Sequence, residues 1–521
     1  MASRTASRRL PALPLLVLLI ALAGGAMLVP AGFALATGEG WLAALFGKAA
    51  LITLAGAAVL GAATAGFRPA DPVRSLFLSL IGAYAVLPPL MALPLAEAVP
   101  DLGFRGAWFE MVSSFTTTGA SLLPPMPETP AAVHLWNALV GWLGGFFVLL
   151  AASALLAPLN LGGLEVGNPR PVGKSAFAAT PIHAAAEPGA RLAAQFRLLA
   201  PVYGALTLAL WVGLLMAGEA GLPALAHAMG ILSTSGISPV GGLEGGQTGR
   251  IGEALMLVFL VFALTRRALP GTARADAATG RRRRLRDDEE LRLAAVVVVG
   301  LAVVFAVRAV AAQAGGVWTQ LDAAQAGFWA GLFTAASFLS TTGYVSADWS
   351  EGAAAALRGA GLGAPVLILG GLVMMGGGVA TTAGGIKLLR IHALWRHGRH
   401  EMEKLLHPSV VAGGGERKRH LRTDGAYLAW LAFMLFVLSL AVVTGALSLA
   451  GLGFEAALVL AIAGLSTTGP LAGMAGIAGE PGLAWLGLDD GARAILAGAM
   501  VLGRLELLAI VALLVPESWR R

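Results

Sequence analysis

The stretch SSFTTTGAS (residues 113–121) lies between two apolar segments, and the chain repeats its core three more times. The later copies read LSTSGIS (232–238), LSTTGYV (339–345) and LSTTGPL (465–471). Each copy contains one glycine, and the glycines of successive copies are 117, 107 and 126 residues apart: Gly119, Gly236, Gly343 and Gly469. This spacing indicates an internal repeat in which four short polar turns interrupt a hydrophobic chain.

The composition is that of an all-α integral membrane protein. The 521 residues are 57% hydrophobic and 12% charged, with a mean hydropathy of +0.78, whereas soluble domains carry about 25% charged residues. The 70 glycines and 27 prolines predict closely packed or broken helices. Cysteine is absent, which excludes disulfides, thiolate metal sites and cysteine nucleophiles.

Since about 20 apolar residues cross the hydrocarbon core, we expect ten membrane spans. They lie near residues 11–36, 41–64, 74–97, 134–158, 194–217, 249–265, 291–314, 362–394, 425–450 and 491–515. The first resembles a signal peptide, but its apolar run is long and a second span follows at once, which favours a retained helix.

Lysine and arginine gather in segments that alternate with poorly basic ones. These basic segments are 1–9, 68–74, 170–191, 266–292 and 387–422. The pattern predicts a multi-pass protein of the cytoplasmic (inner) membrane with both termini in the cytoplasm, and it explains the net charge of +7 without nucleic acid. The run RRRRLRDDEE (281–290) carries both signs, which favours a solvated loop and topology signal over a specific lipid or partner site.

After the first two spans, each pair of spans encloses a short half-helix and one polar turn. Lipid cannot form hydrogen bonds with the N–H and C=O groups of a non-helical backbone. Four such turns at membrane depth must therefore be buried in protein or line a water-filled cavity. We therefore expect four pore-loop repeats around a central ion pore, preceded by two extra N-terminal helices. The expected units are residues 1–68, 69–192, 193–280, 281–422 and 423–521.

The turns suit a dehydrated cation. Rings of backbone carbonyls and threonine hydroxyls can replace lost hydration waters, glycine permits the backbone turn, and a half-helix C-terminus aimed at the axis is partly negative. One Thr-Gly pair is usually a packing or turn feature, but four copies at similar spacing favour a selectivity filter. The predicted filter for K+ comprises Thr117, Thr118, Gly119, Thr234, Ser235, Gly236, Thr341, Thr342, Gly343, Thr467, Thr468 and Gly469.

These phrases, together with WLGGFFVLL (142–150), MGGGVATTAGGIK (375–387) and VLGRLELLAI (501–510), resemble the TrkH/KtrB/HKT superfamily of potassium transporters. The two extra N-terminal spans favour the TrkH branch. The resemblance covers the chain from about residue 70 onward and implies K+ uptake. Sodium-transporting relatives carry a serine in the first filter phrase, whereas this chain has Gly119.

The resemblance further implies an intramembrane gating loop at about residues 375–385, with basic positions at the gate and near the pore axis. The glycine run 376–378 independently predicts a helix break, although close helix packing is an alternative. A phosphate-binding loop is disfavoured because the motif order is wrong. The expected gating residues are Gly376, Gly377, Gly378, Thr381, Thr382, Gly384, Gly385, Lys387 and Arg504.

Two other function classes compete with a channel. An H+- or Na+-coupled symporter would need an intramembrane carboxylate, for which Glu110, Glu253 and Glu455 are the candidates. A membrane-embedded enzyme has no nucleophile and base pair or metal cluster to support it, so we expect no enzymatic activity and no cofactor. By resemblance, we expect a homodimer in membrane lipid with a soluble TrkA/KtrA-type nucleotide-binding regulatory subunit.

Overall fold

The computed structural model describes residues 14–66, 72–156, 188–243, 245–268, 288–312, 317–349, 365–406, 416–474 and 485–505. Helices are the regular secondary structure of the described residues, which contain no strand, so the all-α expectation is confirmed. Much of the basic sequence expected to set orientation, including residues 1–9, 170–187 and 281–287, lies outside the described residues.

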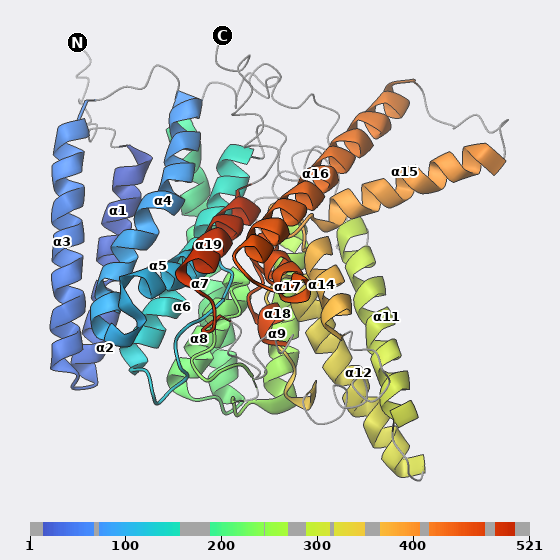
Figure 1. Cartoon of the computed structure of the whole chain (residues 1–521), viewed down its shortest axis with the longest axis horizontal. Coiled ribbons are helices and arrows are strands. Elements are labelled where there is room, and N and C mark those ends of the chain that lie inside the picture. Colours follow the sequence, from blue (N-terminus) through green and yellow to red (C-terminus); the bar gives the residue numbers. More distant parts are fainter. Residues whose placement is uncertain are drawn as a thin grey trace, which may run out of the picture.

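Four helices at the N-terminal side form one group, drawn in blue in Figure 1. They are α1 (Leu15–Ala26), α2 (Leu28–Ala36), α3 (Gly40–Thr64) and α4 (Pro72–Ala98). The first two follow one another through Met27, whose backbone is also helical, and together they make one span of 22 residues. Gly24 lets α1 approach α3, since a Cβ there would lie 3.0 Å from Leu54.

From α4 onward, the described chain contains four successive helix triplets. Their first helices are α4, α7 (Pro188–Met216), α11 (Glu289–Ala312) and α16 (Glu416–Leu449). The middle helices are α5 (Gly103–Phe115), α8 (Gly221–Ser233), α12 (Val317–Leu339) and α17 (Phe454–Leu465). The last helices are α6 (Ala131–Ala151, continued by a π turn over Ala152–Leu156), α9 (Gly249–Leu264), α14 (Pro365–Met375) and α19 (Asp490–Arg504).

Seven helices in the described part of the chain are long and apolar enough to cross a membrane, so this is a multi-pass membrane protein. They are Leu15–Ala36, Gly40–Thr64, Ser75–Ala98, Ala131–Ala154, Gly189–Met216, Glu289–Ala311 and Gly425–Leu449. The other three expected spans correspond to shorter described helices: α9, α14 and α19. The expected span 362–394 is broken after Met375, and residues 506–515 of the last expected span lie outside the described residues.

The third middle helix corrects a sequence-based expectation. A short half-helix was predicted before each turn, but α12 has 23 residues, whereas α5, α8 and α17 have 12 or 13. It remains helical because it packs along α11 through small residues. A Cβ on Gly327 would lie 2.7 Å from Ala309, and one on Gly331 would lie 2.8 Å from Phe305.

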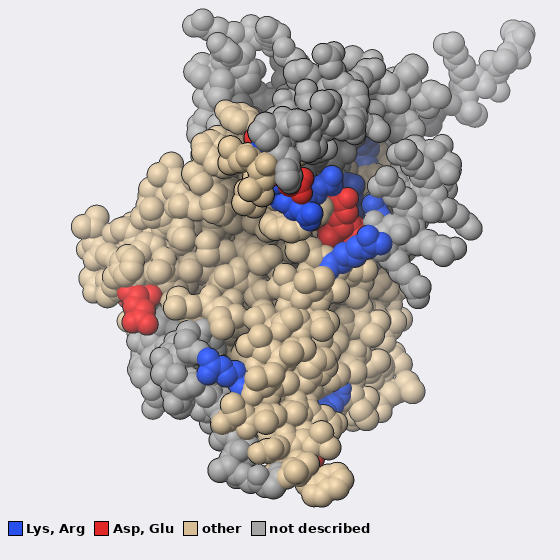
Figure 2. Space-filling model, turned by 90° about the vertical axis from the view of Figure 1, so that its right-hand side faces the viewer, with Lys and Arg blue, Asp and Glu red and all other residues tan. Residues whose placement is uncertain are grey.

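Figure 2 shows a cluster of charged side chains toward one end of the described surface, whereas only a few scattered charged side chains lie on the rest of this face. Two ion pairs at the charged end join separate helices. Arg267 lies 3.7 Å from Asp288, at the start of α11, and Arg396 of α15 (Leu388–Leu406) lies 3.5 Å from Glu289. In Figure 1, α15 extends away from the helical bundle beside the beginning of α16.

The close contact between α11 and α12 predicts an effect on stability. Gly331→Ala would place a methyl group against Phe305, and such overpacking costs about 1–3 kcal/mol. We expect a lower thermal midpoint of the detergent-solubilised protein, measured by loss of its monodisperse chromatographic peak. Gly300→Ala on α11 is the matched control, since nothing lies within 4 Å of its added Cβ and alanine favours helix. Equal midpoints for the two variants would contradict this packing argument.

Candidate functional site

Each middle helix ends in the same unusual turn. The threonine that follows the last helical turn has a positive φ in all four cases: 56° at Thr117, 55° at Thr234, 59° at Thr341 and 54° at Thr467. A β-branched residue rarely adopts this left-handed conformation, which costs of order 1–3 kcal/mol. Its occurrence at four equivalent positions shows that the surrounding structure enforces one backbone shape four times.

Backbone hydrogen bonds close each turn in the same way. The N–H of the residue after the left-handed threonine donates to the carbonyl five residues earlier, as in a Schellman motif. The distances are 2.8 Å from Thr118, 2.9 Å from Ser235, 2.9 Å from Thr342 and 2.8 Å from Thr468. The hydroxyl-bearing residues of the four turns are almost completely buried. The structure thus gives the four predicted filter phrases one common geometry.

The first three turns touch one another through their glycines. A Cβ on Gly119 would lie 2.0 Å from the carbonyl oxygen of Ser235 in the second turn. A Cβ on Gly236 would lie 2.1 Å from the carbonyl oxygen of Thr342 in the third turn. Both glycines also have positive φ, 71° and 62°, so only glycine fits these positions without strain.

The fourth turn closes the ring. The hydroxyl of Thr468 donates to the carbonyl of Thr341 at 3.3 Å, which joins the fourth turn to the third. The N–H of Gly469 donates to the carbonyl of Thr118 at 2.6 Å, which joins the fourth turn to the first. All twelve predicted filter residues therefore lie in one closed ring, in chain order, although they come from positions up to 352 residues apart.

The last helices of two triplets, α6 and α19, support the ring by close approach of their backbones. In the WLGG motif of α6, a Cβ on Gly144 would lie 2.1 Å from the carbonyl of Phe115, and one on Gly145 would lie 2.6 Å from Ser233. In α19, a Cβ on Gly503 would lie 2.0 Å from the carbonyl of Leu465. These glycines let helices pack directly against the ends of α5, α8 and α17.

A non-helical segment, residues 376–387, connects α14 to α15 and contains eight of the nine predicted gating residues. Its ends are tied together by hydrogen bonds of 3.0 Å from Ile386 N–H to the Met374 carbonyl and from Leu388 N–H to the Gly377 carbonyl. Positive φ values at Gly376, Gly385 and Lys387 permit this return of the chain. The segment therefore forms a compact loop and not a continuous span.

This loop lies directly against the ring. The Thr234 hydroxyl donates to the Thr382 carbonyl at 2.9 Å, and Gly384 N–H donates to the Thr341 hydroxyl at 2.7 Å. A Cβ on Gly384 would lie 2.4 Å from the Thr467 hydroxyl oxygen. The loop thus reaches three of the four left-handed threonines.

Arg504 reaches the fourth. Its guanidinium, at the end of α19, donates to the hydroxyl of Thr117, and the residue is buried. The ninth predicted gating residue therefore completes a layer of groups that lies next to all four threonines on one side of the ring.

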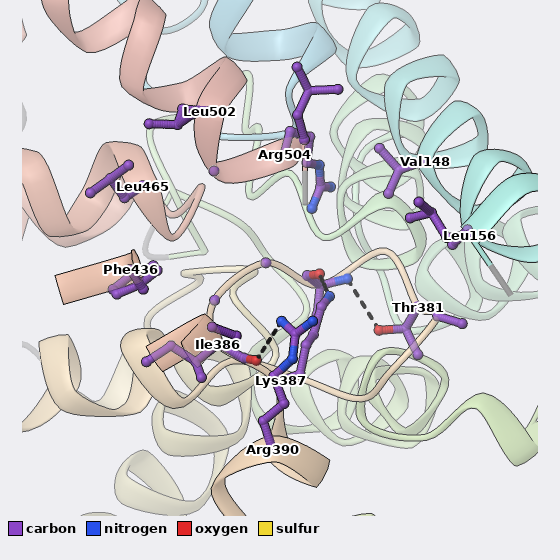
Figure 3. Close-up of a pocket in the computed structure, with 18 residues that line it drawn as sticks. Val148, Leu156, Thr381, Ile386, Lys387, Arg390, Phe436, Leu465, Leu502 and Arg504 are labelled. Carbon is purple, nitrogen blue, oxygen red and sulfur yellow. Dashed lines mark hydrogen bonds between the residues drawn. The ribbon is translucent and has the colours of Figure 1, made fainter. Parts of the chain in front are cut away.

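A cavity of about 70 Å³ lies on the far side of this layer, which is enough for several water molecules. Figure 3 shows Arg504 entering it from α19 and Arg390 entering it from α15 on the opposite side. Lys387 also lines it, and its ammonium donates to the Ala383 carbonyl. Apolar side chains such as Phe436 form much of the remaining wall, and no Asp or Glu of the described residues lines the cavity. The three basic side chains therefore make the cavity positively charged.

Two acidic residues of the run 281–290 have structural roles that the sequence analysis missed. The prediction of a solvated loop is wrong at Asp288 and Glu290, which are only 4% and 3% exposed. Glu290 accepts a 2.9 Å hydrogen bond from Val379 N–H in the loop, and Asp288 accepts one from the Thr265 hydroxyl. A sequence signal existed, because acidic residues at the start of an apolar span also suit a buried helix N-terminus.

Comparisons with known proteins agree with this architecture. The family model described as TrkH, cation transport protein, matches residues 291–520. The Trk system potassium uptake protein TrkI of Halomonas elongata is 28% identical over 435 residues, covering 82% of this chain and 81% of that protein. TrkH of Vibrio parahaemolyticus is 27% identical over 454 residues, covering 85% and 84%. The chain is therefore similar to proteins of the TrkH branch of the superfamily.

The fold matches a solved structure of a TrkH protein. The crystal structure of the potassium transporter TrkH from Vibrio parahaemolyticus superposes with a TM-score of 0.75 at 24% sequence identity. The match covers 97% of this chain and 98% of that chain. The likeness of the folds thus extends to the N-terminal helices, which the family model does not cover.

The position of Arg504 predicts an effect on transport. Arg504→Ala removes a positive charge from the cavity and a hydrogen bond to Thr117, so we expect a higher cation flux, measured as rubidium uptake into proteoliposomes. Arg493→Ala on the same helix is the control, because Arg493 pairs with Asp490 away from the ring. Unchanged flux with reduced thermal stability would assign Arg504 a packing role instead.

Proposed function

We propose that the chain is a potassium uptake protein that conducts K+ through the ring of four turns. The observation that supports this proposal is the closed ring. The same turn geometry occurs four times, and the turns contact one another in order from the first to the fourth and back to the first. The names of the relatives, potassium uptake proteins of Trk systems, support K+ as the transported ion. K+ is then the cargo of the site.

The chemistry of the ring supports a weakly hydrated monovalent cation. Neutral carbonyl and hydroxyl oxygens can replace the hydration shell of K+, and the C-terminal ends of α5, α8, α12 and α17 add partial negative charge beside the ring. The carboxylates that a coupled symporter would use are placed elsewhere. Glu110 and Glu253 each accept three hydrogen bonds from protein groups, and Glu455 is exposed at the start of α17. This placement favours a channel over the symporter.

We further propose that residues 376–387, with Arg504, form the gate. The loop and the guanidinium contact the hydroxyls of the four left-handed threonines, so they occupy the path of an ion that leaves the ring on this side. An unwound segment of this kind can swing aside while the helices on both sides stay in place. The described arrangement then corresponds to a closed pore.

Orientation follows from this assignment. The gate, the cavity and α15 lie on the side that carries the ion pairs of Glu289, which we propose is the cytoplasmic side of the inner membrane, with both chain termini there. The projecting, basic α15 offers a surface for a nucleotide-binding regulatory subunit of the TrkA/KtrA type. We also propose a homodimer, with the membrane lipid around it.

Single-channel recording in planar bilayers tests the function. We expect a reversal potential set by the K+ gradient alone and unmoved by a pH gradient. Gly119→Ser should lower the K+ over Na+ permeability ratio, because its Cβ would displace the Ser235 carbonyl. The control is Gly213→Ala on α7, whose added Cβ meets only one side-chain methyl at 3.4 Å. A reversal potential that follows the pH gradient would show coupled transport and refute the proposal.

The gate generates a separate prediction. Alanines at Gly376, Gly377 and Gly378 would each place a Cβ within 2.3–2.5 Å of loop or α9 atoms, so the described loop position becomes unfavourable. We expect a higher open probability in single-channel records with an unchanged K+ over Na+ ratio. Gly371→Ala on α14, where nothing lies within 4 Å of the added Cβ, should behave as wild type. Altered selectivity with normal gating would place the loop in the filter.

A further inference from the structure

Two buried carboxylates lie behind opposite turns of the ring. Glu110 on α5 and Glu253 on α9 are 1% and 2% exposed. Neither lies in the ring or in the loop that covers it. Each instead accepts hydrogen bonds from the chain that leaves one turn, the first for Glu110 and the third for Glu253.

Glu110 holds the exit of the first turn with both of its oxygens. Oε2 accepts a 2.6 Å hydrogen bond from Leu122 N–H, three residues after Gly119. Oε1 accepts from the Ser121 hydroxyl at 2.8 Å and from the Asn137 side-chain amide of α6 at 2.7 Å. The exit is thereby fixed to both α5 and α6.

Glu253 holds the exit of the third turn in the same way. Oε1 accepts a 2.7 Å hydrogen bond from Ala347 N–H, four residues after Gly343. Oε2 accepts from the Ser346 hydroxyl at 2.8 Å and from the indole N–H of Trp329 on α12 at 2.6 Å. Both sites thus combine a serine hydroxyl, the N–H of the next residue and a side-chain N–H of a neighbouring helix.

The exits of the other two turns are held differently. After the second turn, the Ile237 carbonyl accepts from the Tyr344 hydroxyl at 2.7 Å, and the Ser238 hydroxyl meets His227 at 2.9 Å. Within five residues after Gly236 or Gly469, no carboxylate of the described residues accepts a hydrogen bond. Because the turns follow one another around the ring in chain order, the two carboxylate-held turns are diagonally opposed.

We propose that Glu110 and Glu253 are positioning residues that fix the outer mouth of the pore and thereby set its K+ over Na+ selectivity. This inference rests on the proposed function of the ring. Each carboxylate supplies acceptors on both oxygens, and a glutamine has only one acceptor oxygen. In Glu110→Gln or Glu253→Gln, at least one of the three donors therefore faces the amide NH2, and the exit chain loosens.

Bi-ionic reversal potentials of reconstituted protein test the proposal, because a permeability ratio does not depend on how many molecules are folded. We expect Glu110→Gln and Glu253→Gln each to lower the K+ over Na+ ratio by about three- to tenfold, the loss of roughly one hydrogen bond's stabilisation. The two effects should multiply in the double variant, since Glu110 and Glu253 share no hydrogen-bond partner. Glu455→Gln, at an exposed carboxylate, is the matched control and should keep the wild-type ratio.

Ser121→Ala and Ser346→Ala provide a second pair of variants, which keep the carboxylates and remove one donor each. These serine variants test the proposal if a glutamine variant does not insert into the membrane. We expect them to lower the K+ over Na+ permeability ratio less than the glutamine variants do. Wild-type ratios in all folded variants would overturn the proposal. So would a wild-type reversal potential that follows the pH gradient and loses this dependence in a glutamine variant, since the carboxylate would then be a coupling site. Failure of the proposed function itself would be visible in the wild type, as an absence of K+ current.

Discussion

The left-handed threonine at the end of each middle helix is the constraint on which the architecture depends. A β-branched residue in this conformation is unfavourable by itself, so four of them persist only because hydrogen bonds and neighbours hold them. Each turn is closed by its own helix and then pressed against the next turn. The four turns consequently stabilise one another. A larger side chain at a ring position would collide with an adjacent turn that is itself held in place.

The glycines make this arrangement possible from outside the ring as well as inside it. Gly144, Gly145 and Gly503 bring backbones of α6 and α19 against the ends of the middle helices, where any side chain would collide. Small residues at such contacts are the usual means of close packing in membranes, where lipid gives no hydrophobic drive between helices. These glycines therefore allow the helices of a single chain to pack closely around the ring.

Much of this could be predicted from the sequence because the signals were local and repeated. The Thr-Gly phrases identified the four turns, and the glycine run at 376–378 indicated the break after Met375. The length of α12 could not be predicted, because it depends on packing against α11 and not on a local stop signal. The partners of buried acids were equally inaccessible, since periodicity does not say that Glu290 bonds Val379 or that Glu110 bonds Leu122.

The acidic start of α11 has a thermodynamic consequence. Glu289 contacts α15 through Arg396 and His392, at 3.5 and 3.3 Å, while the adjacent Glu290 holds the loop at Val379. Two neighbouring residues thus join a projecting surface helix to the segment beneath the ring. If a ligand binds α15 more tightly when that loop is displaced, linkage requires that displacing the loop raises the affinity for the ligand by the same factor. Displacement of the loop would then be measurable as a change in ligand affinity at the surface of the protein.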